Sequence, residues 1–283
     1  MTMRELLGHL VRAGREVTMR ARLPFARARR FDACCCGLSK TGTHSMAGLF
    51  ASYRSAHHPD AHTRLLLAMA WLKNEVDAAT VTETLKRRDR LLGLEMESST
   101  LAGTLIESMV DACPEKKFIL TIRDVYSWCD SWLDHNVNEP PAPSSLFGQL
   151  DLIRLRVKDF VPTTYDAPLV ERGFPSLACY FQLWTSHNSR VLDAVPATRL
   201  LVVKTGEIGD RIPDIARWVG VPPETLRADR AWLFAAPKKH GLLAVLDRSY
   251  VREMAERHCG DLMRRYFADD EGHQRMAAPR AVE

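Results

Sequence analysis

A short turn between an apolar run and a predicted helix carries the side chains best suited to binding an anion. Residues 37–45 have the sequence GLSKTGTHS. Glycine allows such a turn to tighten, and backbone N–H groups at the start of the following helix then converge on one point. Lys40 would add a positive charge there, and Thr43 and Ser45 would add hydroxyl groups. We therefore expect a phosphate cradle, for which a purely structural turn and helix cap is the alternative.

The order of residues in this turn differs from that of a Walker A loop. In a Walker loop the lysine follows the second glycine, as in GKS or GKT. Here Lys40 precedes Gly42 by two positions, and Thr43 follows the glycine. The turn is therefore a poor match for a site that holds magnesium together with a β- and γ-phosphate pair.

A second candidate anion site follows the apolar segment FILTI at residues 118–122. Arg123 comes directly after this predicted strand, and a predicted helix spans residues 125–135. Ser127 and Ser131 are four positions apart, so they share one face of that helix. We therefore expect Arg123 and Ser131 to converge on one anion near the start of the helix. A surface ion pair is the alternative role for Arg123.

The elements that would position both sites alternate between strand and helix. Predicted strands span 31–37, 91–97, 118–122 and 199–203, and predicted helices span 45–55, 76–89, 101–112, 125–135, 210–219 and 249–267. This pattern indicates the α/β class, with a parallel β-sheet flanked by helices in a three-layer sandwich like that of P-loop NTPases. Ligands of such sheets bind at the carboxyl ends of the strands, and the proline-rich segment 136–145 could gate that edge.

Composition places the chain among ordinary globular proteins. It has 283 residues, of which 46% are hydrophobic and 26% charged, and a net charge of +4. These values exclude a disordered, collagen-like or disulfide-stapled protein. The charge is too low to predict a nucleic-acid partner, and the seven cysteines, which lack CxxC or zinc spacing, predict free thiols. Because we find neither a secretory signal nor a membrane-spanning apolar stretch, we expect a cytoplasmic protein.

The chain divides into three predicted parts. Residues 1–30 are an arginine-rich helical extension, residues 31–270 the main domain, and residues 271–283 a tail. An apolar stripe beside arginine side chains in the extension permits weak contact with a membrane surface. A helix docked on the main domain is the favoured alternative. The sequence sets no expectation for the oligomeric state.

Two anion sites on one sheet edge suit a nucleotide that carries phosphates at two positions. With both motifs in this order, the sequence resembles the family of sulfotransferases that use 3′-phosphoadenosine 5′-phosphosulfate (PAPS). The resemblance lies in GLSKTGTHS, in FILTIRDVYSWCDSW, and in the eight-residue spacing from Arg123 to Ser131. Weaker similarity at 200–221 and 246–267 extends it over most of residues 31–267.

The resemblance implies which residues bind the donor. In the family the first motif binds the 5′-phosphosulfate and the second binds the 3′-phosphate, without a metal. Carried onto this sequence, the donor-binding residues are Ser39, Lys40, Thr41, Gly42, Thr43, His44, Ser45, Arg123 and Ser131. Lys40 would also stabilise charge on the bridging oxygen of the leaving bisphosphate. Lys238 and Lys239 loosely match a basic loop that closes over the nucleotide.

Two positions of the first motif depart from the family pattern. Ser39 stands where the family often has proline, and His44 stands where it commonly has threonine or serine. Neither change removes Lys40 or Thr43. His44 would contact the 5′-phosphate or line the acceptor pocket, and the sequence does not choose between these roles.

Transfer to a hydroxyl or amine also needs a proton acceptor. Glu95 and Glu97 are expected at the carboxyl end of the strand 91–97, and Glu97 better fits the position of a glutamate base found in some sulfotransferases. His135 is a third candidate, and His57 and His58 are weaker ones. An ion pair at the strand end is the alternative role for the two carboxylates.

We therefore predict a PAPS-dependent sulfotransferase, a transferase of sulfur-containing groups, that acts on a small-molecule acceptor. The acceptor would offer a hydroxyl or an amine, and natural products and lipids are both open. A P-loop kinase or NTPase is the main alternative, which the position of Lys40 disfavours. A non-catalytic domain with the same fold is the third hypothesis.

Overall fold

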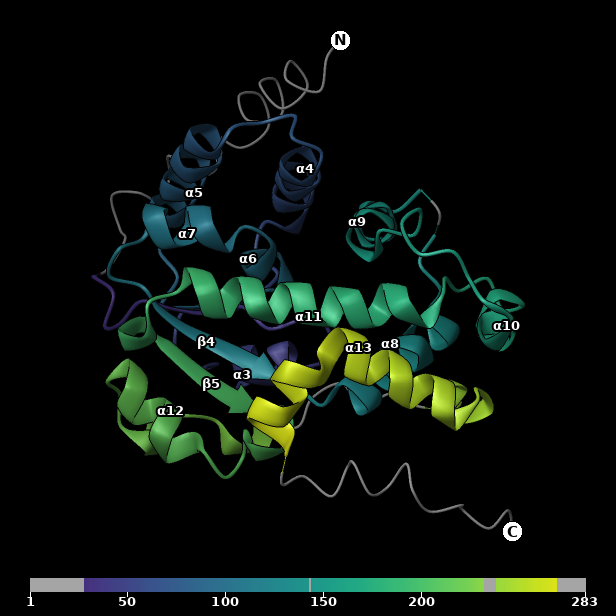
Figure 1. Cartoon of the computed structure of the whole chain (residues 1–283). Coiled ribbons are helices and arrows are strands. Elements are labelled where there is room, and N and C mark those ends of the chain that lie inside the picture. Colours follow the sequence, from purple (N-terminus) through teal and green to yellow (C-terminus); the bar gives the residue numbers. More distant parts are fainter. Residues whose placement is uncertain (1–27, 143, 232–237, 269–283) are drawn as a thin grey trace.

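A five-stranded sheet, in which every strand pair is parallel, organises the chain (Figure 1). The computed structural model describes residues 28–142, 144–231 and 238–268. Strands β1 (Ala33–Cys35), β2 (Ser55–His57), β3 (Met96–Ser98), β4 (Lys117–Ile122) and β5 (Leu200–Lys204) stand in the order β2-β3-β1-β4-β5. Because the strands are parallel, their carboxyl ends share one edge of the sheet.

Helices cover both faces of this sheet. They are α3 (Thr43–Leu49), α4 (Ala61–Leu72), α5 (Ala78–Leu92), α6 (Thr100–Thr104), α7 (Ile106–Ala112), α8 (Val125–Asn138), α9 (Leu146–Leu155), α10 (Ala167–Val170), α11 (Leu177–Ala194), α12 (Ile212–Val219) and α13 (Arg248–Phe267). Short 3₁₀ turns lie at Thr164–Asp166, Ala197–Arg199, Thr205–Glu207, Pro223–Thr225, Ala228–Arg230 and Leu242–Val245.

The alternation of side chains along β1 shows how the layers are built. Cys34 and Cys36 belong to a buried cluster with α4, α5, α6, α7 and α11, whereas Cys35 belongs to a cluster with α3 and α12. Successive side chains of a strand point to opposite faces of a sheet. The sheet is therefore the middle of three layers, which confirms the predicted α/β sandwich.

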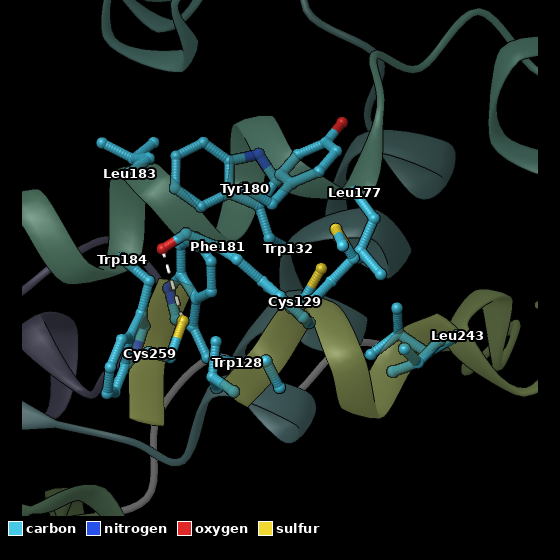
Figure 2. Packing of buried hydrophobic residues seen from close by; sticks show 14 of the residues in the cluster. Trp128, Cys129, Trp132, Leu177, Tyr180, Phe181, Leu183, Trp184, Leu243 and Cys259 are labelled. Carbon is cyan, nitrogen blue, oxygen red and sulfur yellow. Dashed lines mark hydrogen bonds between the residues drawn. The ribbon is translucent and has the colours of Figure 1, made fainter. Parts of the chain in front are cut away.

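A third buried cluster, drawn in Figure 2, joins α8, α11 and α13. Trp128 and Trp132 meet edge to face, with ring centres 5.1 Å apart. The indole Nε1 of Trp128 donates to the carbonyl of Ser39 at 3.0 Å, and that of Trp184 donates to the carbonyl of Arg123 at 3.0 Å. Buried indole N–H groups need such acceptors. The aromatic core is therefore hydrogen-bonded to the backbone of both predicted anion segments, at Ser39 and at Arg123.

Most predicted helices agree with the structure. The predicted helices at 76–89, 125–135, 210–219 and 249–267 correspond to α5, α8, α12 and α13. The predicted helix 101–112 is divided at Leu105 into α6 and α7. The boundaries of α5, α8, α12 and α13 differ from the predicted ones by at most three residues, as expected where helix ends fray.

The predicted strand 91–97 is wrong over its first half. Leu91 and Leu92 complete the last turn of α5, and Gly93 ends that helix in the left-handed region with φ of 56°. Glycine is the residue that most readily adopts this conformation after a helix. Strand β3 therefore begins only at Met96. The elements β2 and α4 were not predicted at all.

Some predictions concern parts of the chain outside the described ranges. The extension lies outside up to residue 27, and so does the tail 271–283, so membrane-surface contact stays a prediction. Among the residues that the structure does describe, no helix combines the length and apolar character needed to cross a bilayer. All seven cysteines are buried free thiols, as predicted.

Candidate functional site

The two predicted anion segments meet at the carboxyl edge of the sheet. Strands β1 and β4 are direct neighbours, so the turn that follows β1 lies beside Arg123. Arg123 donates from Nη1 to the carbonyl oxygen of Lys40 at 3.4 Å. A Cβ atom on Gly37 would overlap Thr121 Oγ1, so this close approach of the two segments requires glycine. The expected proximity of Arg123 to the cradle is confirmed.

Lys40 and Arg123 bring two positive charges together. Both side chains are half-buried, and neither forms an ion pair with any residue that the structure describes. Burial lowers the pKa of both groups, and Arg123 lowers the pKa of Lys40 further. Two mutually repelling, partly desolvated cations fit a site that an anion completes.

Within the turn, side chains divide into those that build it and those that line it. Thr41 is fully buried, donates to the carbonyl of Leu38 at 2.7 Å and pairs with Thr121 Oγ1 at 2.9 Å. Its hydroxyl therefore stabilises the turn, and only its backbone could reach a ligand. Gly42 precedes α3 with φ of 95°. Because α3 has seven residues, Lys40 and Arg123, rather than the helix dipole, carry the positive potential of this site.

Helix α8 aligns the second anion site. Asp124 caps it by accepting from the backbone N–H of Ser127. Arg123 donates from Nε to Ser127 Oγ at 2.9 Å, and Ser131 follows one turn later on the same face. Ser131 is half-buried, and no described residue hydrogen-bonds to its hydroxyl. That Arg123 and Ser131 bind one anion together stays a prediction.

A cluster of histidines lies beside Lys40. His57 is the last residue of β2 and His58 follows it directly, and the ring of His57 stacks on that of His44 at 3.5 Å between centres. His57 Nε2 lies 3.2 Å from Thr43 Oγ1, and His58 Nδ1 lies 2.8 Å from the hydroxyl of Ser99. Strand β2 thus delivers two imidazoles to the edge that holds the cradle.

These imidazoles are neutral at pH 7. Burial and the neighbouring histidines lower the pKa of His57 to about 3, and burial and Arg64 lower that of His58 to about 4. Burial and Lys40 lower the pKa of both His44 and His135. Each neutral ring has one unprotonated nitrogen, whose lone pair can accept a proton.

The placement predicted for Glu97 is wrong. Because β3 begins at Met96, Glu97 lies within the strand and its side chain enters the layer formed by α4 and α5. It forms ion pairs with Arg64, and with Arg88 at 2.8 Å, and the pKa of its carboxyl falls to about 2. Both oxygens are occupied and the residue is buried, so Glu97 is not available to take a proton from an acceptor.

The placement predicted for Glu95 is wrong as well. Glu95 precedes β3 and therefore lies toward the amino end of the sheet. Its carboxylate accepts from Arg30 Nε at 2.9 Å and from the backbone N–H of Arg54 at 3.0 Å, and its pKa falls to about 2. These bonds join the segments that lead into β1, β2 and β3. The alternative of an ion pair is therefore confirmed for both carboxylates.

Helix α8 also holds the basic segment around Lys238. Asn138 donates to the carbonyl of Lys238 at 2.9 Å, and Asp134 accepts from the backbone N–H of His240 at 2.7 Å. The side chains of Lys238 and Lys239 are exposed next to the end of α8. An open cavity of about 400 Å³ adjoins this segment and is lined by Asn136, Val137, Pro140, Arg172, Phe174, His240 and Leu242. Lys40 and Arg123 do not line it.

Sequence reasoning underrated His57 and His58 and missed Arg64. The signal for the first two was the pair His57-His58 before Pro59, where a chain leaves a short strand. The signal for Arg64 was a lone cation beside the apolar run LLLAMAWL at residues 65–72, which has the length of a buried helix. A buried cation of this kind needs an acidic partner, and Glu97 is the partner found.

Comparison with known proteins identifies the family of the chain. Residues 34–212, which include both anion segments and the histidine cluster, match the sulfotransferase domain family. Among solved structures, a sulfotransferase from Alicyclobacillus acidocaldarius is similar, with 15% identity and a TM-score of 0.48 over 88% of this chain and 100% of that one. Comparison with curated proteins finds no match. Since the family match spans more than half of the chain, the chain belongs to the sulfotransferase domain family.

Proposed function

We propose that the protein transfers a sulfuryl group from PAPS to a hydroxyl or amine of a small molecule. The observation that carries the proposal is the half-buried pair Lys40 and Arg123, which has no ion-pair partner in the described parts of this sulfotransferase-family chain. PAPS is anionic at both its 5′ and its 3′ position. Each cation can therefore neutralise one end of the same nucleotide, and no metal is needed for that.

Each cation has a separate task in this proposal. Arg123, with Ser131, holds the 3′-phosphate, because a planar guanidinium can donate two parallel hydrogen bonds to phosphate oxygens. Lys40 lies at the 5′ end and stabilises the charge that develops on the bridging oxygen as the sulfuryl group leaves. Lys238 and Lys239 are close enough to the end of α8 to add exposed positive charge.

The proton acceptor comes from the histidine cluster. Glu95 and Glu97 are engaged in ion pairs, whereas His44, His57, His58 and His135 are neutral rings, and the charge of Lys40 acts on His44 and His135. Phe147 is 37% exposed and packs edge-on against His58, with ring centres 5.4 Å apart. An apolar surface beside the base supports an acceptor whose reactive group is attached to an apolar or aromatic body. Free buried thiols suit a reducing compartment, so we place the reaction in the cytoplasm.

The test is sulfate transfer from labelled PAPS. Purified protein is incubated with labelled PAPS and a small-molecule extract, and label is followed into new products. We expect label transfer that 3′-phosphoadenosine 5′-phosphate (PAP) inhibits, and a rise in melting temperature with PAP that exceeds the rise with ATP–Mg²⁺. A larger rise with ATP–Mg²⁺ than with PAP would overturn the proposal in favour of a P-loop kinase or NTPase.

A further inference from the structure

We propose that Thr43 couples donor binding to the proton of His57. In the free protein the ring proton of His57 lies on Nδ1; when the 5′-phosphate end of the nucleotide binds, it lies on Nε2 and leaves Nδ1 as the proton acceptor. The inference rests on the proposed function, because it requires a phosphate oxygen beside Thr43. It makes His57 the catalytic base and adds a positioning role to Thr43.

The Thr43 hydroxyl has a single hydrogen to donate. Thr43 is 4% exposed, and His57 Nε2, at 3.2 Å, is the partner of its hydroxyl among the described residues. A buried hydroxyl that leaves its hydrogen unsatisfied is costly. In the free protein Thr43 therefore donates to His57 Nε2. A neutral imidazole has one donor and one acceptor nitrogen, so its proton must then lie on Nδ1.

A phosphate oxygen reverses this bond. Phosphate oxygens accept hydrogen bonds, so a phosphate in the cradle takes the hydrogen of the Thr43 hydroxyl. The hydroxyl then has no hydrogen left for His57 and offers that ring a lone pair. The hydrogen bond between them can persist if Nε2 carries the ring proton and donates it to the hydroxyl. The ring proton accordingly moves to Nε2, and Nδ1 gains the free lone pair that a general base requires.

The neighbouring His58 shows the opposite case, in which the protein itself fixes the proton. Ser99 caps α6 by accepting from the backbone N–H of Leu101 at 3.2 Å. Its own hydrogen therefore points to His58 Nδ1, 2.8 Å away. The proton of the neutral His58 ring then lies on Nε2 whether or not nucleotide is bound. His58 is a fixed donor, and His57 is the ring whose state can change.

The surroundings of His57 keep its ring neutral before reaction. The titratable groups that face it are His44 from α3 and His58, which directly follows β2. Both act, with burial, against the protonated form of His57. No carboxylate contacts the ring among the described residues. The ring of His57 is therefore uncharged at pH 7, and its unprotonated nitrogen can take a proton from the acceptor molecule.

The transfer step balances with these assignments. A lone pair of the acceptor oxygen or nitrogen forms the new bond to sulfur, and the bond from sulfur to the bridging oxygen breaks. Its electron pair stays on the 5′-phosphate, where Lys40 lies opposite the new charge. The acceptor proton passes to His57 Nδ1, and the resulting imidazolium donates from Nε2 to Thr43. Solvent takes the proton after the products leave.

The test is nitrogen NMR of histidine side chains in the full-length protein. Protein with ¹⁵N-labelled histidine is recorded without and with saturating PAP, and the protonated ring nitrogen of each histidine is identified from long-range couplings. His57→Gln assigns the signals of His57, and His62→Gln, at an exposed position on α4, serves as the matched control. We expect His57 to change from Nδ1–H to Nε2–H, while His58 is Nε2–H in both samples.

A pair of variants separates the hydroxyl from the bulk of Thr43. Thr43→Ser keeps the hydroxyl and should show the same change at saturating PAP, whereas Thr43→Val keeps the shape and should not. Calorimetry on each protein establishes that PAP is bound. Absence of saturable PAP binding to wild-type protein would overturn the proposed function together with this inference. Saturable binding with the proton of His57 on the same nitrogen in both states would overturn the inference alone.

Discussion

Two groups of charged side chains in this fold are built in opposite ways. Within the layer that covers one face of the sheet, Glu97 is paired with Arg64 and Arg88, and both of its oxygens are engaged. At the carboxyl edge of the sheet, Lys40 and Arg123 lie together, and no carboxylate among the described residues forms an ion pair with either of them. Both groups contain the residue types of an active site. What separates a structural cluster from a binding site here is whether the chain itself completes the pairing of charges.

The difference leads to opposite expectations for substitution. A paired buried charge contributes to the folded state, and its loss leaves its partners uncompensated. An unpaired, half-buried cation slightly lowers the stability of the folded state. Its removal should therefore reduce activity and leave stability intact. The following experiments ask whether the two clusters respond in this way.

Glu97→Gln should reduce the free energy of unfolding by about 3–5 kcal/mol, because Arg64 and Arg88 would remain buried without a counter-charge. Urea denaturation followed by circular dichroism measures the change. Glu107→Gln is the matched control, since Glu107 pairs with Arg190 at an exposed position and should change stability by no more than about 0.5 kcal/mol. Equal, small effects of both substitutions would show that the Glu97 cluster is not structural.

Lys40→Ala should have the opposite effect, with a large loss of activity and little change in stability. In the proposed function Lys40 stabilises the leaving phosphate, so its loss is expected to lower the rate of sulfate transfer about 10²–10³-fold. Stability should be unchanged or slightly higher, because burial and Arg123 disfavour the protonated lysine in the folded protein. Labelled-sulfate transfer gives the rate, and urea denaturation of the same preparation gives the free energy of unfolding. Lys86→Ala, on the exposed side of α5, is the control. A strongly destabilised Lys40→Ala protein with normal specific activity would reverse the assignment of the two clusters.

The histidine cluster predicts an effect of pH on stability. An unfolded histidine binds a proton near pH 6.5, whereas folded His57 and His58 do so only near pH 3 and 4. The unfolded state therefore binds more protons below pH 6.5, and stability should fall on acidification by up to about 1.4 kcal/mol per pH unit for each ring.

Urea denaturation between pH 6.5 and 4.5 checks this, because Glu95 and Glu97 remain ionised in both states over most of that window. The double variant His57→Gln, His58→Gln should show a flatter profile than wild type. The same slope in both proteins would show that these two rings do not titrate as their burial indicates.

The cradle and the three-layer fold could be predicted from sequence because their signals are local. Glycine, lysine and threonine in residues 37–45 directly follow an apolar strand, and Arg123 directly follows another. In a parallel sheet both segments must end at the same edge, so their proximity follows from topology. Helices such as α13 were equally accessible, because apolar spacing persists over several turns.

The roles of Glu97 and the histidines could not be predicted, because they depend on register and on distant partners. Gly93 ends α5 and delays β3, which moves Glu97 from the strand end into a layer of arginines. Strand β2 has three residues, too few for a periodic pattern, yet it places His57 against Thr43. Such contacts join residues that no short motif contains.

The proposed pairing of Arg123 with the 3′-phosphate can be tested by comparing two nucleotides on two proteins. Dissociation constants for PAP and for 5′-AMP, which lacks the 3′-phosphate, are measured by calorimetry on wild type and on Arg123→Gln. We predict that wild type binds PAP about 10–100-fold more tightly than 5′-AMP, as expected for hydrogen bonds between charged groups, and that Arg123→Gln binds both about equally. The same preference for PAP in both proteins would contradict the account, since the cation at the sheet edge would then not meet the 3′-phosphate.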